Sequence, residues 1–350
     1  MNIGMKAKMQ KVMKTTFNNL LTPKFEDNFE VTLNYPLWIT EDPLTLKREC
    51  KRGLLEVAET YKKVSLAYSG GSDSGFLLCC LRDLINEGKL KKDTIEVFQG
   101  VFRLGGIPQD DAARATRFAH SLGFDHKIYN LEIDDTIHNK VIDYTLNFIS
   151  RYNTTQENYY NTYVCSLQDI VSEMHGDTII RAVFTASQTF SPRITDGVIV
   201  DNDDNHWDIP VNMVTHYDPD SPNPHEIEFF LWDNRIYSCF ISPFKLKRRL
   251  IDSEPLPEIP ISVPTHPNYF NKYLDKWMIY LQCYPEMSEI LFKIPSLNRE
   301  ARAKDIRIMK FTESLKQKYP DQKKCFAKKP DGQYFTRKDL LNYEEYFDVS

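Results

Sequence analysis

The sequence predicts an α/β protein in which a twisted parallel sheet carries helices on both faces, followed by a helical C-terminal region. Between residues 61 and 135, short apolar segments typical of buried strands alternate with amphipathic segments of helical periodicity. Strands and helices that alternate in this way are joined by crossovers, which make the strands parallel and cover both faces of the sheet. Ligands of such sheets bind at the carboxyl ends of the strands.

The individual elements follow from local signals taken in chain order. Residues 40–43, Thr-Glu-Asp-Pro, combine acids with a proline, which is a start signal for the helix that follows. Gly88 and Gly123 stand where the next two helices should stop. The expected elements are a strand within 29–39, helices over 44–61, 74–87 and 110–123, and strands over 64–68, 95–102, 126–131 and 179–184.

The chain divides into four expected regions. Residues 1–60 form a lead-in, 61–190 the α/β domain, 191–241 an irregular insertion or lid, and 242–350 a mainly helical region. Within the insertion, two apolar runs flank Asp233-Asn234, which predicts a β-hairpin over 227–241.

Composition argues against several classes of protein. No apolar stretch reaches the roughly 18 residues of a membrane helix, so no membrane association is expected. The seven cysteines are odd in number and include no Cys-x-x-Cys, which argues against a disulfide framework and a structural zinc site. A reducing, cytoplasmic setting is therefore expected.

Charge is unevenly distributed along the chain. The total is −5, but residues 293–338 hold fourteen Lys or Arg and only five Asp or Glu. A solvated helical face explains such a block, and so does a phosphate-rich partner such as RNA or DNA. Aromatic residues between the lysines, such as Tyr319 and Phe326, keep the second interpretation open.

The most informative stretch is the loop after the first core strand, residues 69–74, Ser-Gly-Gly-Ser-Asp-Ser. Glycines let the backbone bring N–H groups close to a ligand, and the following helix adds unpaired N–H groups at its positive end. Ser69, Ser72 and Ser74 add hydroxyl groups to this anion site. Asp73 would repel a bare phosphate, so it indicates a bound Mg²⁺.

The sextet Ser-Gly-Gly-x-Asp-Ser, between a strand and a helix, resembles the pyrophosphate loop of the N-type ATP pyrophosphatases, in particular the asparagine synthetase branch. The resemblance implies a fold like that of the adenine nucleotide α-hydrolases, with ATP and Mg²⁺ as cofactors. It also implies nucleotide contacts along the loop and an adenine site between two strand ends. The residues so assigned are Leu66, Ala67, Ser69, Gly70, Gly71, Ser72, Asp73, Ser74, Gln99 and Gly100, with Asp73 as metal ligand and catalytic residue.

Two later segments bear on the same resemblance. The branch carries an acidic metal-binding motif after its fourth strand, whereas residues 185–188 here are Thr-Ala-Ser-Gln. Lys276 is the candidate for the lysine that the branch places near the pyrophosphate. The adjacent cysteines Cys79 and Cys80 lie in the helix expected after the loop and are expected to be core residues.

The sequence therefore predicts an ATP-dependent ligase or amidotransferase. It would adenylate a carboxylate or carbonyl oxygen of a small molecule and release pyrophosphate, after which ammonia or an amine would displace AMP. A separate subunit could supply the ammonia. One alternative is modification of a tRNA or DNA base by the same adenylation, with the basic segment 293–338 as nucleic-acid site. The other is a non-catalytic nucleotide-binding protein.

Overall fold

The computed structural model describes most of the predicted α/β domain and several later segments. The longer stretches are residues 44–61, 64–105, 112–152, 279–291 and 305–319. Further described parts are the short strands and helices named below and the helical residues 163, 166–167, 170–171, 235–236 and 239.

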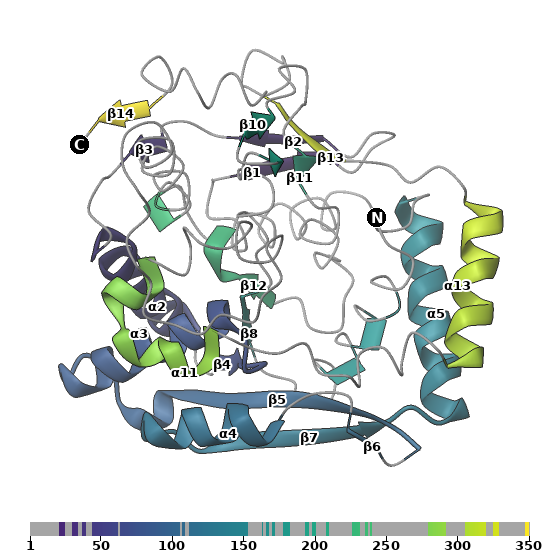
Figure 1. Ribbon diagram of the computed structural model, residues 1–350, viewed down its shortest axis with the longest axis horizontal. Helices are drawn as coiled ribbons and strands as arrows, with labels where there is room; N and C mark the ends of the chain where they lie inside the picture. The colour runs from purple at the N-terminus through teal and green to yellow at the C-terminus, as the bar shows by residue number, and fades with distance from the viewer. Residues whose placement is uncertain are drawn as a thin grey trace, which may run out of the picture.

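A six-stranded sheet forms the centre of the described structure (Figure 1). Five strands run parallel in the order β12, β8, β4, β5 and β7, and the short β6 pairs antiparallel with the end of β5. Their bounds are β4 Val64–Ala67, β5 Ile95–Leu104, β6 Ile107–Pro108, β7 His126–Glu132, β8 Thr178–Arg181 and β12 Glu226–Glu228. The parallel sheet expected from the sequence is confirmed.

Strand order reverses beside β4. The chain places β5 and then β7 on one side of β4, and later adds β8 and β12 on its other side. Open parallel sheets bind ligands at such a reversal, outside the carboxyl ends of the strands. The loop that begins after β4 lies at this position.

Three helices match their expected bounds closely: α2 Leu44–Thr60, α3 Ser72–Asn86 and α4 Ala112–Ser121. The helices α5 Asp135–Tyr152, α11 Ser288–Leu291 and α13 Ile306–Lys318 follow further along the chain. Gly88 follows α3 with a φ of 69° and Gly123 follows α4 with a φ of 84°. Both glycines thus end helices as predicted, because this conformation is easy only for glycine.

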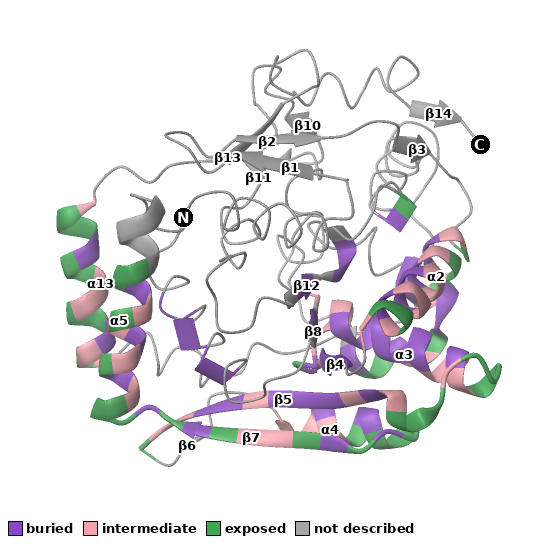
Figure 2. Cartoon of the chain, turned by 180° about the vertical axis from the view of Figure 1, so that it is seen from behind, coloured by how far each residue is buried: buried purple, intermediate pink, exposed green. Residues whose placement is uncertain are grey.

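Apolar side chains cover both faces of the sheet. Successive residues of a strand point to opposite faces, and Val97 and Phe98 of β5 accordingly belong to different buried clusters. The first cluster joins the sheet to α2, α3, α4 and α11, and the second joins it to α5, α13 and the helical residues Tyr163, Leu167, Ile170 and Val171. Figure 2 shows β4, β5 and α3 as largely buried and α13 as mostly exposed.

The predicted hairpin over 227–241 is wrong. Glu226–Glu228 is the edge strand β12, which pairs in parallel with β8, and a 3₁₀ helix over Phe229–Leu231 follows it. Residues 235, 236 and 239 are helical. Phe229, Phe230 and Ile236 are fully buried in the first cluster, so burial against the sheet prevails over the local turn signal.

Short strands outside the main sheet form three small sheets. A four-stranded one has the order β1, β2, β13, β11, and the pairs β9–β10 and β3–β14 make two more. The bounds are β1 Leu21–Lys24, β2 Glu30–Leu33, β3 Leu37–Ile39, β9 Arg193–Thr195, β10 Val198–Val200, β11 Asp208–Ile209, β13 Cys325–Lys328 and β14 Phe347–Val349. Because β13 and β14 belong to the C-terminal region, its described part mixes strands with helices.

Among the described helices, none is both long and apolar enough to span a lipid bilayer.

Candidate functional site

The loop between β4 and α3 is a tight turn at the carboxyl end of β4. Gly70 has a φ of 74°, and a Cβ placed there would lie 2.9 Å from the Cβ of Ala115 in α4. Glycine avoids both the backbone strain and the close contact. Helix α4 therefore lies directly against the loop and fixes its course.

The loop leads into a helix start that suits an anion. Gly71 is the N-cap of α3 and offers no side chain to the first amide groups of the helix. The hydroxyl of Ser74 accepts a hydrogen bond from the Ser69 N–H (3.4 Å) and donates one to the Gly71 carbonyl (3.5 Å), which braces the turn. Amide groups left without a capping side chain, at the positive end of a helix, bind phosphate groups readily.

Asp73, in the first turn of α3, meets a tyrosine from the distant segment 279–291. The Tyr280 hydroxyl donates a hydrogen bond to Asp73 Oδ1 over 2.7 Å. The Tyr280 side chain is fully buried and its ring stacks on Phe76, with centroids 4.4 Å apart. Burial, and then the negative charge of Asp73, raise the pKa of Tyr280 well above its usual value, so the hydroxyl remains a donor at neutral pH.

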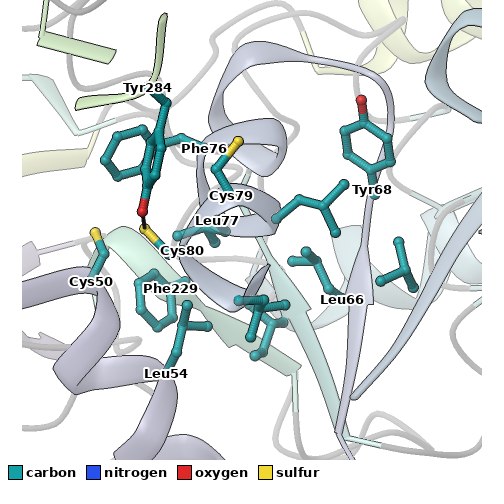
Figure 3. Close-up of a cluster of buried hydrophobic side chains, with 14 of the residues drawn as sticks. Cys50, Leu54, Leu66, Tyr68, Phe76, Leu77, Cys79, Cys80, Phe229 and Tyr284 are labelled. Carbon is teal, nitrogen blue, oxygen red and sulfur yellow. Dashed lines mark hydrogen bonds between the residues drawn. The ribbon is translucent and has the colours of Figure 1, made fainter. Parts of the chain in front are cut away.

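A second tyrosine, Tyr284, binds the other end of α3. Its hydroxyl lies 3.0 Å from Asp83 Oδ2 and 3.4 Å from the sulfur of Cys80, and its ring packs edge-on against Phe76 (Figure 3). Lys47 lies 2.8 Å from Asp83. Burial acts to raise the pKa of Asp83, but hydrogen bonds from Lys47 and Arg82 lower it overall. The segment 279–291 is thus joined to α3 at two carboxylates about three helical turns apart.

Two buried polar atoms lie beside the end of β4, one from Tyr68 directly after β4 and one from Gln99 in the adjacent β5. The Tyr68 N–H donates to the Phe98 carbonyl (2.7 Å), and beyond this point β5 continues along β7 while β4 has ended. The Tyr68 hydroxyl and Gln99 Oε1 are buried, and neither has a hydrogen-bond partner within the described part of the chain. Leaving such an atom unbonded costs about 1–3 kcal/mol, which a ligand group bound there could offset.

The two cysteines after the loop are packing residues, as expected. Cys79 and Cys80 are fully buried, and the Cys79 sulfur lies 3.8 Å from that of Met287. Burial raises the pKa of Cys80 to about 12 and that of Cys79 further. Both are therefore protonated at neutral pH, whereas a nucleophilic cysteine must form a thiolate.

The structure brings most of the predicted site residues together at the carboxyl end of β4. Leu66 and Ala67 lie in β4, Gln99 and Gly100 lie in the adjacent β5, and residues 69–74 form the turn and the start of α3. Their contacts with a nucleotide stay a prediction. Lys276 and residues 185–188 lie outside the described residues.

Tyr280 is the residue that sequence reasoning missed. It stands four residues after Lys276 and four before Tyr284 in a stretch expected to be helical. Residues four apart share a face of a helix, so the spacing indicates a two-tyrosine face. It does not indicate that this face meets the loop, 207 residues earlier in the chain.

The residues present fit a magnesium ion held mainly by its substrate. Within the described ranges, no group of three or more His, Cys, Asp or Glu side chains could hold a metal. Mg²⁺ does not need such a group, because one or two carboxylates, substrate phosphates and waters complete its shell. Asp73, half-buried beside the uncapped helix start, is a suitable single carboxylate.

The solved structures named below are distantly similar to this chain. No protein-family model and no curated protein matches the chain. A glutamine-dependent NAD⁺ synthetase from Acinetobacter baumannii, in complex with ADP, is 14% identical with a TM-score of 0.29. The match covers 45% of this chain and only 28% of that synthetase.

Two further solved structures are similar at the same level. An NMN synthetase from Francisella tularensis is 11% identical with a TM-score of 0.29, covering 74% of this chain and 100% of that one. An NH₃-dependent NAD synthetase from Campylobacter jejuni subsp. jejuni, in complex with nitrate, is 14% identical with a TM-score of 0.28, covering 80% and 95%. Similarity this low identifies no substrate, and we infer the site from the chain's own residues.

Proposed function

We propose that this protein is an ATP-dependent, AMP-forming ligase. The observation that supports this best is the Ser69–Ser74 turn, which joins a parallel strand beside the strand-order reversal to an uncapped helix start bearing Asp73. The loop amides and the start of α3 would bind the β- and γ-phosphates of ATP. Asp73 would hold Mg²⁺, which supplies charge neutralisation at the phosphates.

The proposed chemistry needs no protein nucleophile. An oxygen of the acceptor attacks the α-phosphorus of ATP, the bond to the β-phosphate oxygen breaks, and pyrophosphate leaves. The amide groups of the loop and the positive end of α3 stabilise the negative charge that gathers on pyrophosphate. Ammonia or an amine then attacks the activated carbon, and AMP departs with the former acceptor oxygen. The acceptor would be a small molecule with a carboxylate or carbonyl group.

Gln99 and Tyr68 support a nucleotide beside the loop. Their buried polar atoms lie beside the carboxyl end of β4, near where the resemblance places the adenine. A bound base carries donors and acceptors that could satisfy both atoms. Gln99 would thus contribute its side chain to the adenine site that the resemblance implies.

A second candidate is adenylation of a nucleic-acid base. The described part of the basic segment includes α13, on which Lys310, Lys316 and Lys318 are exposed. Exposed lysines on one short helix favour contact with a phosphate backbone. The same active-site loop would serve this reaction.

Product analysis with ATP labelled in the α-phosphate tests the proposal. The protein is incubated with Mg²⁺ and either a small-molecule pool or total RNA, and we expect labelled AMP to appear with equimolar pyrophosphate. AMP that forms only with RNA would favour the second candidate. Labelled ADP would show that a different bond is broken and would contradict the proposal.

The variant Asp73→Asn distinguishes an enzyme from a non-catalytic nucleotide-binding protein. It should reduce AMP formation at least 100-fold, because the amide cannot replace a charged metal ligand. Asp93→Asn is the matched control, since Asp93 is an exposed aspartate at the opposite end of β5. Asp73→Asn protein with unchanged turnover would exclude the assigned role.

A further inference from the structure

We infer that Tyr280 is a positioning residue for Asp73, whose carboxylate it orients toward the metal and phosphate site. The inference rests on the proposed function and extends it to a residue 207 positions away in the chain. It assigns Tyr280 no contact with substrate.

The hydrogen bond is suited to this role by its length and its surroundings. Tyr280 donates to Asp73 Oδ1 over 2.7 Å, within the usual range for a hydroxyl and a carboxylate. Tyr280 is fully buried and Asp73 is half-buried, so the bond is partly shielded from water. Holding one carboxylate oxygen fixes the plane of the group and therefore the direction in which it presents charge.

Phe76 determines where the tyrosine ring lies. Phe76 is three residues after Asp73, so both side chains share a face of α3. The Tyr280 ring stacks on Phe76 at an interplanar angle of 22°, and both side chains are fully buried. Packing thus holds the hydroxyl in place before any ligand binds, which reduces the entropy lost when the metal is bound.

Tyr284 shows what a purely structural bond from the same segment looks like. Its hydroxyl also binds an α3 aspartate, and its ring also packs on Phe76. That aspartate, Asp83, already pairs with Lys47 and Arg82 and is ten residues from the loop residue Asp73. Tyr284 therefore provides a matched control for the loss of one buried hydroxyl.

Groups that hold a metal-binding carboxylate in place have a characteristic energetic effect. Removing such a partner typically weakens metal affinity about 10–100-fold, although the partner never touches the ion. A merely structural tyrosine would change stability without changing what the metal contributes to nucleotide binding. The two roles are therefore separable by measurement.

The experiment uses the full chain and a non-hydrolysable probe, α,β-methylene-ATP. Its dissociation constant is measured by calorimetry with saturating Mn²⁺ and again with EDTA. The constant in EDTA divided by the constant in Mn²⁺ gives the contribution of the metal to binding. We expect Tyr280→Phe to reduce this ratio about 10–100-fold and to leave binding in EDTA within about twofold. Tyr284→Phe should leave the ratio unchanged.

A double variant tests whether Tyr280 acts through Asp73. Asp73→Asn should lower the ratio by itself, and adding Tyr280→Phe should lower it no further, because coupled residues are not additive. Phe76→Leu gives a second route if Tyr280→Phe does not fold. It keeps the hydroxyl but removes the stacked ring, and we expect a partial loss of the metal contribution.

The outcomes distinguish this inference from the proposed function. If the wild type binds nucleotide, two results would overturn the inference but not the proposed function. One is an unchanged ratio in Tyr280→Phe. The other is an equal loss in Tyr280→Phe and Tyr284→Phe. An unchanged ratio in Phe76→Leu would contradict it too. A wild type that binds no nucleotide in either condition would overturn the proposed function together with the inference.

Discussion

Single residues of the loop have different roles. Gly70 makes the turn possible, Ser74 braces it, and Asp73 brings the only charge of the sextet to the start of α3. The turn could be predicted because each of these roles depends on residue type and immediate neighbours. The role of Tyr280 could not be predicted, because it depends on a contact with Asp73 that forms only when the chain folds.

Gly70→Ala should destabilise the protein by about 2–4 kcal/mol. A φ of 74° costs an alanine roughly 1–2 kcal/mol, and the close approach to Ala115 adds an overpacking cost of similar size. Urea unfolding measures the loss. Gly88→Ala is the control, since its φ of 69° is similar but nothing lies within 4 Å of the added Cβ. Equal losses in the two variants would show that Ala115 does not constrain the loop.

Individual elements were predictable where a local signal sufficed. The strands and helices from residue 44 to residue 132 lie within a few residues of their expected bounds, because apolar periodicity and glycine stops are local. The hairpin expected over 227–241 failed for the opposite reason. Parallel pairing of Glu226–Glu228 with Thr178–Arg181 joins strands far apart in the chain, and no turn signal reports it.

Helices α5 and α13 lie side by side, and Arg307 connects them (Figure 1). Its guanidinium donates to Asp135 at the start of α5 (2.8 Å) and to the Ile133 carbonyl (3.0 Å). One of the positive charges of the basic segment therefore has a structural partner. Ile308, the next residue of α13, is buried in the second cluster.

Arg307→Ala should therefore loosen α13. We expect a loss of about 1 kcal/mol, since the ion pair is largely exposed while the bond to the carbonyl is better protected. Hydrogen exchange of the α13 amides should be several-fold faster than in the wild type. Lys310→Ala, an exposed change on the same helix, is the control. Unchanged exchange in Arg307→Ala would mean that Ile308 and its neighbours hold α13 without the arginine.

At the scale of the whole molecule, stability should depend on a buried histidine. Burial lowers the pKa of His126 to about 4, and a hydrogen bond from its ring to the Tyr68 backbone acts in the opposite direction. Its Nδ1 lies 2.9 Å from the Thr116 hydroxyl. In the unfolded chain the pKa of histidine is about 6.5. Between these values the unfolded chain binds more protons than the folded protein.

The stability from His126 is therefore fully present above about pH 6.5 and is lost as the pH falls toward 4. We expect the free energy of unfolding, measured in urea, to decrease between pH 7 and pH 5. His126→Gln should decrease less over this range. Nearby His120 also lowers the pKa of His126, so His120→Gln should show a slightly smaller decrease than the wild type. His138, whose pKa burial and Arg307 also lower, should leave a residual slope in His126→Gln.

The docking of segment 279–291 on α3 has a consequence for anyone who prepares fragments of this protein. A shortened chain that stops after residue 241 would keep the whole Ser-Gly-Gly-Ser-Asp-Ser turn and five parallel strands. It would also lose Tyr280, Tyr284 and Met287, which now cover Phe76 and Cys79. Such a fragment would expose an apolar stripe beside the Ser69–Ser74 turn, and we expect it to aggregate rather than serve as a minimal nucleotide-binding unit.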